Sequence, residues 1–385
     1  MNLLASFIFE LPTRIEYGIG ASGKLVDAFK QLKAEKVLVV TDKGIESSGL
    51  LSGILQLLTQ NKLKFDVFSA VEANPKDYNV HAGTELACQM EADCLVALGG
   101  GSPIDCAKAI AVAATHGGDI REYEAGNKIT GEVLPLIAIP TTAGTGSEVT
   151  FSSVITDTSR DFKFSIHHFR LAPRIALLDP EMTLTMPPAL TAATGMDALT
   201  HAIEAYVSSL SWSLTDPHAC HAIKLVFRHL KKAVQRRSLD PLEGMAIASL
   251  EAGAAFSNAI LGAVHALAHP LGGRYDIHHG LANAILLPVV LQKNLEHAPE
   301  KYALIANAMG IDTRGKSSLE AAQQVPAQIE GLIRALDIPT RLSQLGVRKE
   351  DIPYLALDAA EDLCMNTNPQ RYDAAEIESL YLNAL

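Results

Sequence analysis

The stretch that decides the fold is CLVALGGGSPIDCAKAIAVAAT, residues 94–115. Its first five residues, 94–98, are all apolar and predict a buried strand. Three glycines follow directly, and the small and apolar residues 104–115 predict a helix. A strand, a glycine-rich turn and a helix in this order are typical of a crossover unit in a parallel sheet.

The glycine turn has the composition of a phosphate site. Glycines 99–101 lack the Cβ atoms that would keep a phosphate away from backbone N–H groups. Ser102 at an N-cap position, Pro103 at the first helical position and Asp105 three residues after Ser102 predict a capping-box-like helix start, whose free N–H groups favour an anion. A tight turn without a ligand explains this loop equally well, because it is not a GxGxxG sequence.

Strands and helices continue to alternate on both sides of this stretch. Further strands are predicted at 36–41, 64–69, 134–139 and 174–178, with helices at 79–90 and 104–115, and a separate short strand pair at 7–20. The alternation predicts an α/β domain with a mostly parallel, Rossmann-like sheet.

The β pattern fades after Pro187 and Pro188, which suit a helix start. Helices are predicted at 189–208, 219–235, 242–261, 280–294, 319–336 and 374–385. We therefore expect two domains, an α/β domain at 1–185 and an all-helical domain at 186–385. A length of 385 residues is ample for both, at about 150 residues per domain.

Composition excludes several classes of protein. The formal net charge of -11 and an aromatic content of 5% argue against nucleic-acid binding. No apolar run is long enough for a membrane span, and the first residues lack the pattern of a signal peptide. Five cysteines without a CxxC pair indicate reduced thiols, so we expect a cytoplasmic protein.

A second loop and a carboxylate strengthen the prediction of a cofactor site. Residues 140–148, PTTAGTGSE, follow the predicted strand 134–139, and Asp42 follows the strand 36–41. Ligands of open α/β sheets bind beyond the carboxyl ends of the strands, where an aspartate can bind a ribose hydroxyl and repel a 2′-phosphate. A polar turn and a helix-capping aspartate are the alternatives.

The predicted helical domain contains a set of histidines at helical spacing. Asp197 and His201 are four residues apart, as are His265 and His269, and neighbours at this spacing share a helix face. His278 and His279 follow. Each histidine alone suits a hydrogen-bonded core position, but together with Asp197 they favour a metal held by nitrogen and oxygen donors, such as Fe(II), Zn, Mn or Co. The spacing leaves open which histidines are ligands.

Nine motifs in order resemble the iron-dependent (group III) alcohol dehydrogenases over nearly the whole chain. They are TDKG (41–44), ANP (73–75), GGGSPIDCAKA (99–109), PTTAGTGSEVT (140–150), DP (179–180), MPPALTAATGMDALTHAIEAY (186–206), GAVHALAHPLGG (262–273), HHGLANAILLP (278–288) and NP (368–369). The resemblance implies a dehydroquinate synthase-like fold, with a dinucleotide-binding domain at 1–185 and an all-helical metal-binding and substrate domain at 186–385.

The resemblance also implies roles for particular residues. The implied metal ligands are Asp197, His201, His265 and His279, which leaves His269 as a catalytic proton relay. The implied cofactor-binding residues are Asp42, Asn74, Gly100, Gly101, Ser102, Asp105, Thr141, Thr142, Thr150, Ser152, Lys163 and Met182, and Phe151, Phe256 and Cys364 would line the substrate pocket. The family often has Leu at the position of Met182 and commonly Pro at that of His278, which makes His278 a second-choice ligand.

We therefore expect a metal-dependent, NAD(H)-linked alcohol dehydrogenase for a small primary alcohol or diol and its aldehyde, with Fe(II) or Zn in a cleft between the domains. The expected assembly is a homo-oligomer, a dimer or larger, with no nucleic-acid or membrane partner. The alternatives are a glycerol dehydrogenase-like or dehydroquinate synthase-like enzyme on the same scaffold, or a metal hydrolase. The last would leave both glycine loops without a purpose.

Overall fold

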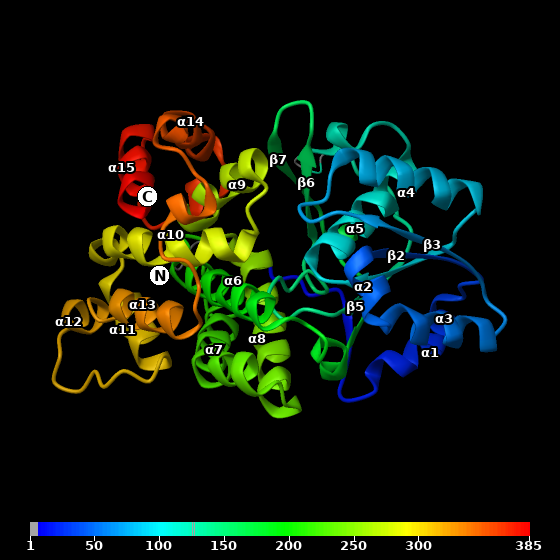
Figure 1. Cartoon of the computed structure of the whole chain (residues 1–385), viewed down its shortest axis with the longest axis horizontal. Coiled ribbons are helices and arrows are strands. Elements are labelled where there is room, and N and C mark those ends of the chain that lie inside the picture. Colours follow the sequence, from blue (N-terminus) through cyan, green and yellow to red (C-terminus); the bar gives the residue numbers. More distant parts are fainter. Residues whose placement is uncertain (1–6, 125, 127) are drawn as a thin grey trace.

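The computed structural model describes residues 7–124, 126 and 128–385. Strands and helices alternate in one lobe, and helices alone form the other (Figure 1). The described residues contain one six-stranded sheet in the order β1-β8-β5-β4-β2-β3, and every pairing in it is parallel. Its strands are β1 Arg14–Tyr17, β2 Lys36–Asp42, β3 Lys64–Val71, β4 Cys94–Gly99, β5 Leu136–Pro140 and β8 Ile175–Leu178.

Helices cover both faces of the sheet, because its central strands are apolar on both sides. Val39 and Val96 belong to one core cluster, whereas Val40 and Ala97 belong to the other. Alternate residues of a strand point to opposite faces, so an unbroken apolar run predicts a sheet covered twice. The covering helices are α1 Leu25–Leu32, α2 Lys43–Ser48, α3 Leu50–Gln60, α4 Asp77–Gln89 and α5 Gly101–His116.

The second lobe packs around one continuous apolar core. Its helices are α6 Pro188–Val207, α7 Asp216–Arg236, α8 Leu239–Ala259, α9 Ala263–Tyr275, α10 His279–Asn294, α11 Pro299–Ala308, α12 Ser318–Ala322, α13 Val325–Ala335, α14 Ile352–Glu361 and α15 Ala374–Ala384. The expected fold class, an α/β domain with a parallel sheet followed by an all-helical part, is confirmed. The change from strands to helices occurs between Leu178, the end of β8, and Pro188, the start of α6, and this interval contains the predicted boundary at residue 185. The division into two domains stays a prediction.

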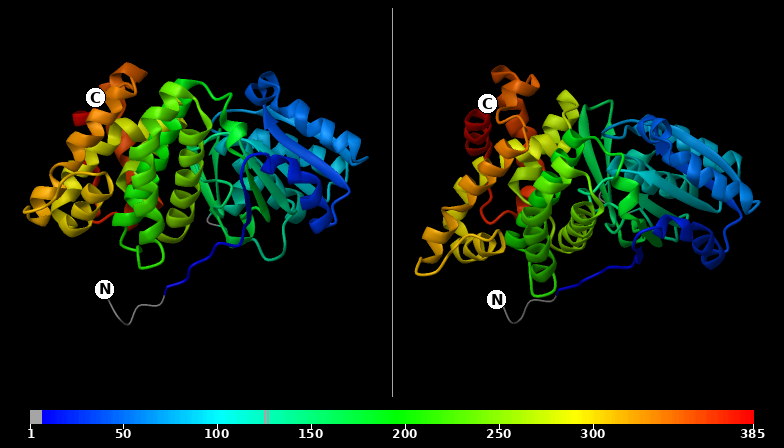
Figure 2. Two further views of the ribbon diagram at one scale, coloured as in Figure 1. Left: turned by 90° about the horizontal axis from the view of Figure 1, so that it is seen from below. Right: turned by 60° about the horizontal axis from the view of Figure 1, so that its bottom comes forward.

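Two local predictions were wrong. The strand pair at 7–20 does not form, because β1 pairs in parallel with β8, at the edge of the main sheet. Residues 7–13 run along the helical lobe (Figure 2). There the backbone N–H of Glu10 donates to Asn258 Oδ1 (2.7 Å). The single helix predicted at 319–336 is two helices, and Pro326, which has no N–H to donate, stands at the start of the second.

An antiparallel hairpin was missed by the sequence analysis. Strands β6 Ser152–Asp157 and β7 Phe162–His167 form a two-stranded sheet of their own. The hairpin follows the second glycine loop and brings Lys163 toward α9, since a Cβ on Gly272 would lie 2.5 Å from Lys163 Nζ. Among the described residues no single helix is long and apolar enough to span a membrane; α8 and α9 pass that test only as a pair, bent by 102°.

Candidate metal centre and cofactor cleft

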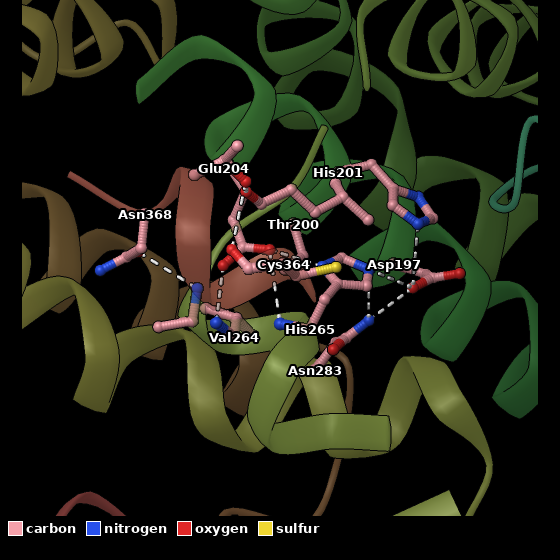
Figure 3. Close-up of polar contacts among 12 residues, drawn as sticks. Asp197, Thr200, His201, Glu204, Val264, His265, Asn283, Cys364 and Asn368 are labelled. Atoms are coloured by element: carbon pink, nitrogen blue, oxygen red, sulfur yellow. Dashed lines mark hydrogen bonds and ion pairs between the residues drawn. The ribbon is translucent and has the colours of Figure 1, made fainter. Parts of the chain in front are cut away.

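Four side chains from three helices converge at one point in the helical lobe. Asp197 and His201 lie on α6, His265 lies on α9, and His279 is the first residue of α10. One donor atom from each lies within 4.8 Å of the others. The Nε2 atoms of His201, His265 and His279 are 3.9, 4.0 and 3.9 Å from Asp197 Oδ1. Figure 3 shows Asp197, His201 and His265 pointing toward one another.

The electrostatics of this cluster suit a cation. Burial, and then the neighbouring histidines, lower the pKa of His265 and of His279 well below the usual range. Both rings are therefore neutral and have a lone pair to offer, as a metal ligand requires. A tetrahedral ion with bonds of about 2.1 Å separates its ligands by roughly 3.4 Å. Each histidine nitrogen would need to move about half an ångström closer to Asp197 Oδ1 to reach that separation.

His269 lies beside this cluster with a partner of its own. Its ring is stacked on that of His279, with ring centroids 5.4 Å apart. Its Nδ1 donates to Asp362 Oδ2 (2.7 Å), and Cys364 lies within the same small group. The sequence analysis missed Asp362, because nothing in a sequence places it next to a histidine 93 positions earlier. His278 is the N-cap residue of α10 and lies outside the four-residue cluster.

The first glycine loop lies at the carboxyl end of β4. Helix α5 begins at Gly101 with Gly100 as its N-cap residue and no side-chain cap, so the predicted capping by Ser102 was wrong. Ser102 is inside the first turn, and Asp105 instead accepts hydrogen bonds from Ser147 Oγ and the N–H of Val154. The start of α5 thus keeps free N–H groups, as a pyrophosphate site requires.

The two glycine loops are in close contact. A Cβ on Gly100 would lie 3.0 Å from Thr142, and one on Gly101 would lie 2.8 Å from Thr145. Thr141 Oγ1 is buried and has no hydrogen-bond partner among the described residues, so it is available to a ligand. The close approach explains why both loops are made of small residues.

A buried lysine that the sequence analysis missed holds the second loop to α5. Lys108 Nζ donates to Ser147 Oγ, Thr150 Oγ1 and the carbonyl of Ser152, each at 2.8 Å. Burial lowers the pKa of Lys108 to about 8. Its place in the sequence, between small and apolar residues of a helix, was the available signal, since a buried lysine needs partners.

The other predicted cofactor residues follow the ends of the sheet strands. Asp42 ends β2 and caps α2 by accepting from the N–H of Ile45 (2.9 Å), which is the helix-cap role that the sequence left open. Asn74 follows β3 and accepts from Lys163 Nζ (2.6 Å), while Met182 is buried after β8. Burial lowers the pKa of Lys163 to about 8. With both glycine loops, these residues mark the carboxyl edge of the sheet, where such folds bind ligands.

Two of the three predicted pocket residues lie at the metal cluster. The ring of Phe256 stacks on His201 with centroids 4.4 Å apart, and Cys364 belongs to the group around His269. Phe151 lies against His167 instead, with centroids 4.9 Å apart.

Comparison with known families covers both lobes. The iron-containing alcohol dehydrogenase model matches residues 12–180, and the model for the C-terminal part of the Fe-containing alcohol dehydrogenase family matches residues 191–385. This chain belongs to the iron-containing alcohol dehydrogenase family. It is therefore an oxidoreductase acting on alcohols and aldehydes, with NAD and a divalent metal as the cofactors of the family.

Individual relatives match this alcohol dehydrogenase over almost their full length. It is 43% identical to 1,3-propanediol dehydrogenase of Klebsiella pneumoniae, covering 98% of each chain. It is 39% identical to NAD-dependent methanol dehydrogenase of Bacillus methanolicus, covering 98% of this chain and 99% of the relative. The crystal structure of a 1,3-propanediol oxidoreductase superposes with a TM-score of 0.96 at 43% identity, covering 99% of this chain and 100% of that one.

Proposed function

We propose that this alcohol dehydrogenase interconverts a small primary alcohol or diol and its aldehyde in the cleft between the two lobes. The observation that carries the proposal is the buried cluster of one carboxylate and three imidazoles on α6, α9 and α10. Relatives named for 1,3-propanediol and methanol support a small substrate. The family match favours this function over a glycerol dehydrogenase-like or dehydroquinate synthase-like one.

Asp197, His201, His265 and His279 would hold the metal. A divalent ion supplies Lewis-acid polarisation of the substrate oxygen, and NAD supplies the hydride acceptor. His269 would act as the proton relay, because its Nδ1 is bound to Asp362 and its Nε2 is left to take up or release a proton. Phe256 and Cys364, with Phe151 farther from the metal cluster, would border the substrate and limit its size.

The α/β lobe would bind NAD along the carboxyl edge of its sheet. Asp42 would contact the adenosine ribose through the carboxylate oxygen that does not cap α2, and the start of α5 would receive the pyrophosphate. The remaining proposed cofactor contacts are Asn74, Gly100, Gly101, Ser102, Asp105, Thr141, Thr142, Thr150, Ser152, Lys163 and Met182. Of these, Asp105 would act indirectly, because its carboxylate already holds the second loop.

Three broader features belong to the same proposal. We expect residues 1–185 and 186–385 to be separate domains, and the enzyme to form a homo-oligomer. A cytoplasmic location is supported by the five cysteines, all of which are free. Light scattering after size-exclusion chromatography tests the assembly, and a single monomer mass would contradict it.

A substrate panel tests the proposed activity. The enzyme, loaded anaerobically with Fe(II), is given NAD and a series of C2–C4 alcohols and diols, and the absorbance of NADH is followed. We expect turnover within this series, with activity falling for branched or charged substrates. Silence across the panel, in protein that binds both NAD and metal, would contradict a small neutral substrate and favour the dehydroquinate synthase-like alternative.

A further inference from the structure

A buried carboxylate beside the metal cluster has no role in the function described so far. Glu204 lies on α6, three residues after His201 and seven after Asp197, so all three share one face of the helix. Its exposed fraction is 3%, yet it is not one of the four clustered donors. A carboxylate this deeply buried needs hydrogen-bond donors or a cation nearby.

The donors come from the first turn of α9. Glu204 Oε1 accepts from the N–H of Val264 (2.6 Å), and Oε2 accepts from the N–H of His265 (3.4 Å). Oε2 also accepts from Nδ1 of the His265 ring, at 2.5 Å (Figure 3). A Cβ on Gly262, the N-cap residue of α9, would lie 2.9 Å from Glu204 Oε1. The glycine therefore leaves the space in which the carboxylate reaches both the helix start and the ring.

The contacts of the His265 ring decide which nitrogen carries the proton. Burial raises the pKa of Glu204 to about 7, but the backbone N–H groups of Val264 and His265 favour its ionised form. An ionised carboxylate only accepts hydrogen bonds, so Nδ1 donates. Nε2 faces Asn283 Nδ2 (3.1 Å), and that amide nitrogen also donates to Asp197 Oδ1 (2.7 Å). Nε2 is therefore the unprotonated nitrogen, and its lone pair, which accepts from Asn283 here, is the one that a metal would use. Two independent neighbours, one on each side of the ring, select the same tautomer.

The charges of the site also favour an ionised carboxylate at Glu204 once a metal is bound. Three neutral imidazoles and Asp197 leave a divalent ion with one uncompensated positive charge in an apolar core. Glu204 supplies a second negative charge one imidazole away from the cluster, which offsets that positive charge. A carboxylate behind a ligand histidine also raises the basicity of its other nitrogen.

We propose that Glu204 is the positioning residue of the metal centre: by holding Nδ1–H of His265 it fixes the ring orientation and presents Nε2 to the metal. The inference rests on the proposed metal site and adds a residue that binds neither metal nor substrate.

The test is a Co(II) titration of the metal-stripped protein, followed by its visible d–d absorption. Glu204→Gln keeps the shape of the side chain but turns an N–H group toward donors, so we expect Co(II) to bind about 10- to 100-fold more weakly, with a shifted band. Asn368→Ala is the matched control. Asn368 Oδ1 accepts from the N–H of Ala263 in the same helix turn and does not touch the His265 ring. We expect Asn368→Ala to lower the melting temperature of the protein and to leave both its Co(II) affinity and its Co(II) spectrum unchanged.

The outcomes separate the inference from the proposed site. Wild-type protein that binds no Co(II) would contradict the metal site itself. Wild-type affinity and spectrum in folded Glu204→Gln protein would overturn the role of Glu204 alone. If the variant does not fold, ¹⁵N NMR of the histidine rings in metal-stripped wild type decides the question, with the His265 signals assigned by His265→Gln. We expect a protonated Nδ1 and a bare Nε2, and the opposite tautomer would overturn the proposal.

Discussion

The clustered metal donors are side chains, whereas the proposed cofactor site at the start of α5 consists largely of backbone N–H groups and glycines. Asp197 and His265 are almost fully buried, and their amide and carboxylate neighbours, Asn283 and Glu204, hold them in place. At the start of α5 the important groups are N–H bonds, which every residue except proline has, and the absence of Cβ atoms at Gly100 and Gly101. Mutations should therefore affect the two sites differently. Loss of a donor side chain should abolish metal binding, whereas changes at the start of α5 should weaken NAD binding only partly.

The largest effect is expected from removing a metal ligand. Asp197→Ala should abolish metal binding and lower kcat/KM by about 10³-fold, because Lewis-acid stabilisation contributes several kcal/mol and each 1.4 kcal/mol is a factor of ten. Mass spectrometry measures the metal content of the variant, and the rate of NADH formation gives its kcat/KM. NAD affinity, measured by calorimetry, should be unchanged, and full metal occupancy in this variant would contradict the ligand assignment.

Two histidines on α9, His265 and His269, should differ in whether their loss removes the metal. His269→Gln should retain metal and lower kcat by about 10²-fold through loss of proton transfer. His265→Ala, four residues earlier on α9, should lose metal and activity together. Metal analysis of both variants checks the assignment, and the reverse pattern would exchange the two roles.

A smaller effect is expected from filling space in the cofactor cleft. Gly101→Ala places a Cβ 2.8 Å from Thr145 Cγ2, at the start of α5 where we propose that the pyrophosphate binds. KM for NAD should therefore rise about tenfold with metal content unchanged. Gly53→Ala is the matched control, because a Cβ there has nothing within 4 Å. An equal KM in both variants would mean that the pyrophosphate does not approach α5.

The smallest effect concerns cofactor choice. Asp42→Ser removes the charge while retaining a residue that caps α2, so stability should change little. The ratio of kcat/KM for NAD to that for NADP should fall by about tenfold, since the carboxylate no longer repels a 2′-phosphate. Asp27→Ser, on the exposed face of α1, controls for general loss of charge, and an unchanged ratio in Asp42→Ser would limit Asp42 to its capping role.

The same contrast explains what the sequence could predict. Apolar strands and Asp–His spacing at 197 and 201 depend on residue identity, so the fold class and the four clustered donors were predictable with the family resemblance. Asp362 and Glu204 were not, because each depends on a histidine partner distant in sequence. The burial of Lys108 had a local signal in its small and apolar neighbours, but its partners in the second loop did not. The capping by Ser102 failed because free N–H groups, not a cap, begin α5. The hairpin β6–β7 had a visible alternation in its second strand that the analysis overlooked.

The central claim is that the α/β lobe binds NAD and that the metal in the helical lobe is needed for turnover. The most direct test measures NAD binding and turnover separately in one preparation. The metal-stripped enzyme is titrated with NAD in a calorimeter, and is then supplied with 1,3-propanediol while Fe(II), Zn or Co(II) is restored anaerobically. We predict NAD binding without metal and NADH formation only after metal is restored. NADH formation by protein that contains no metal would contradict the account.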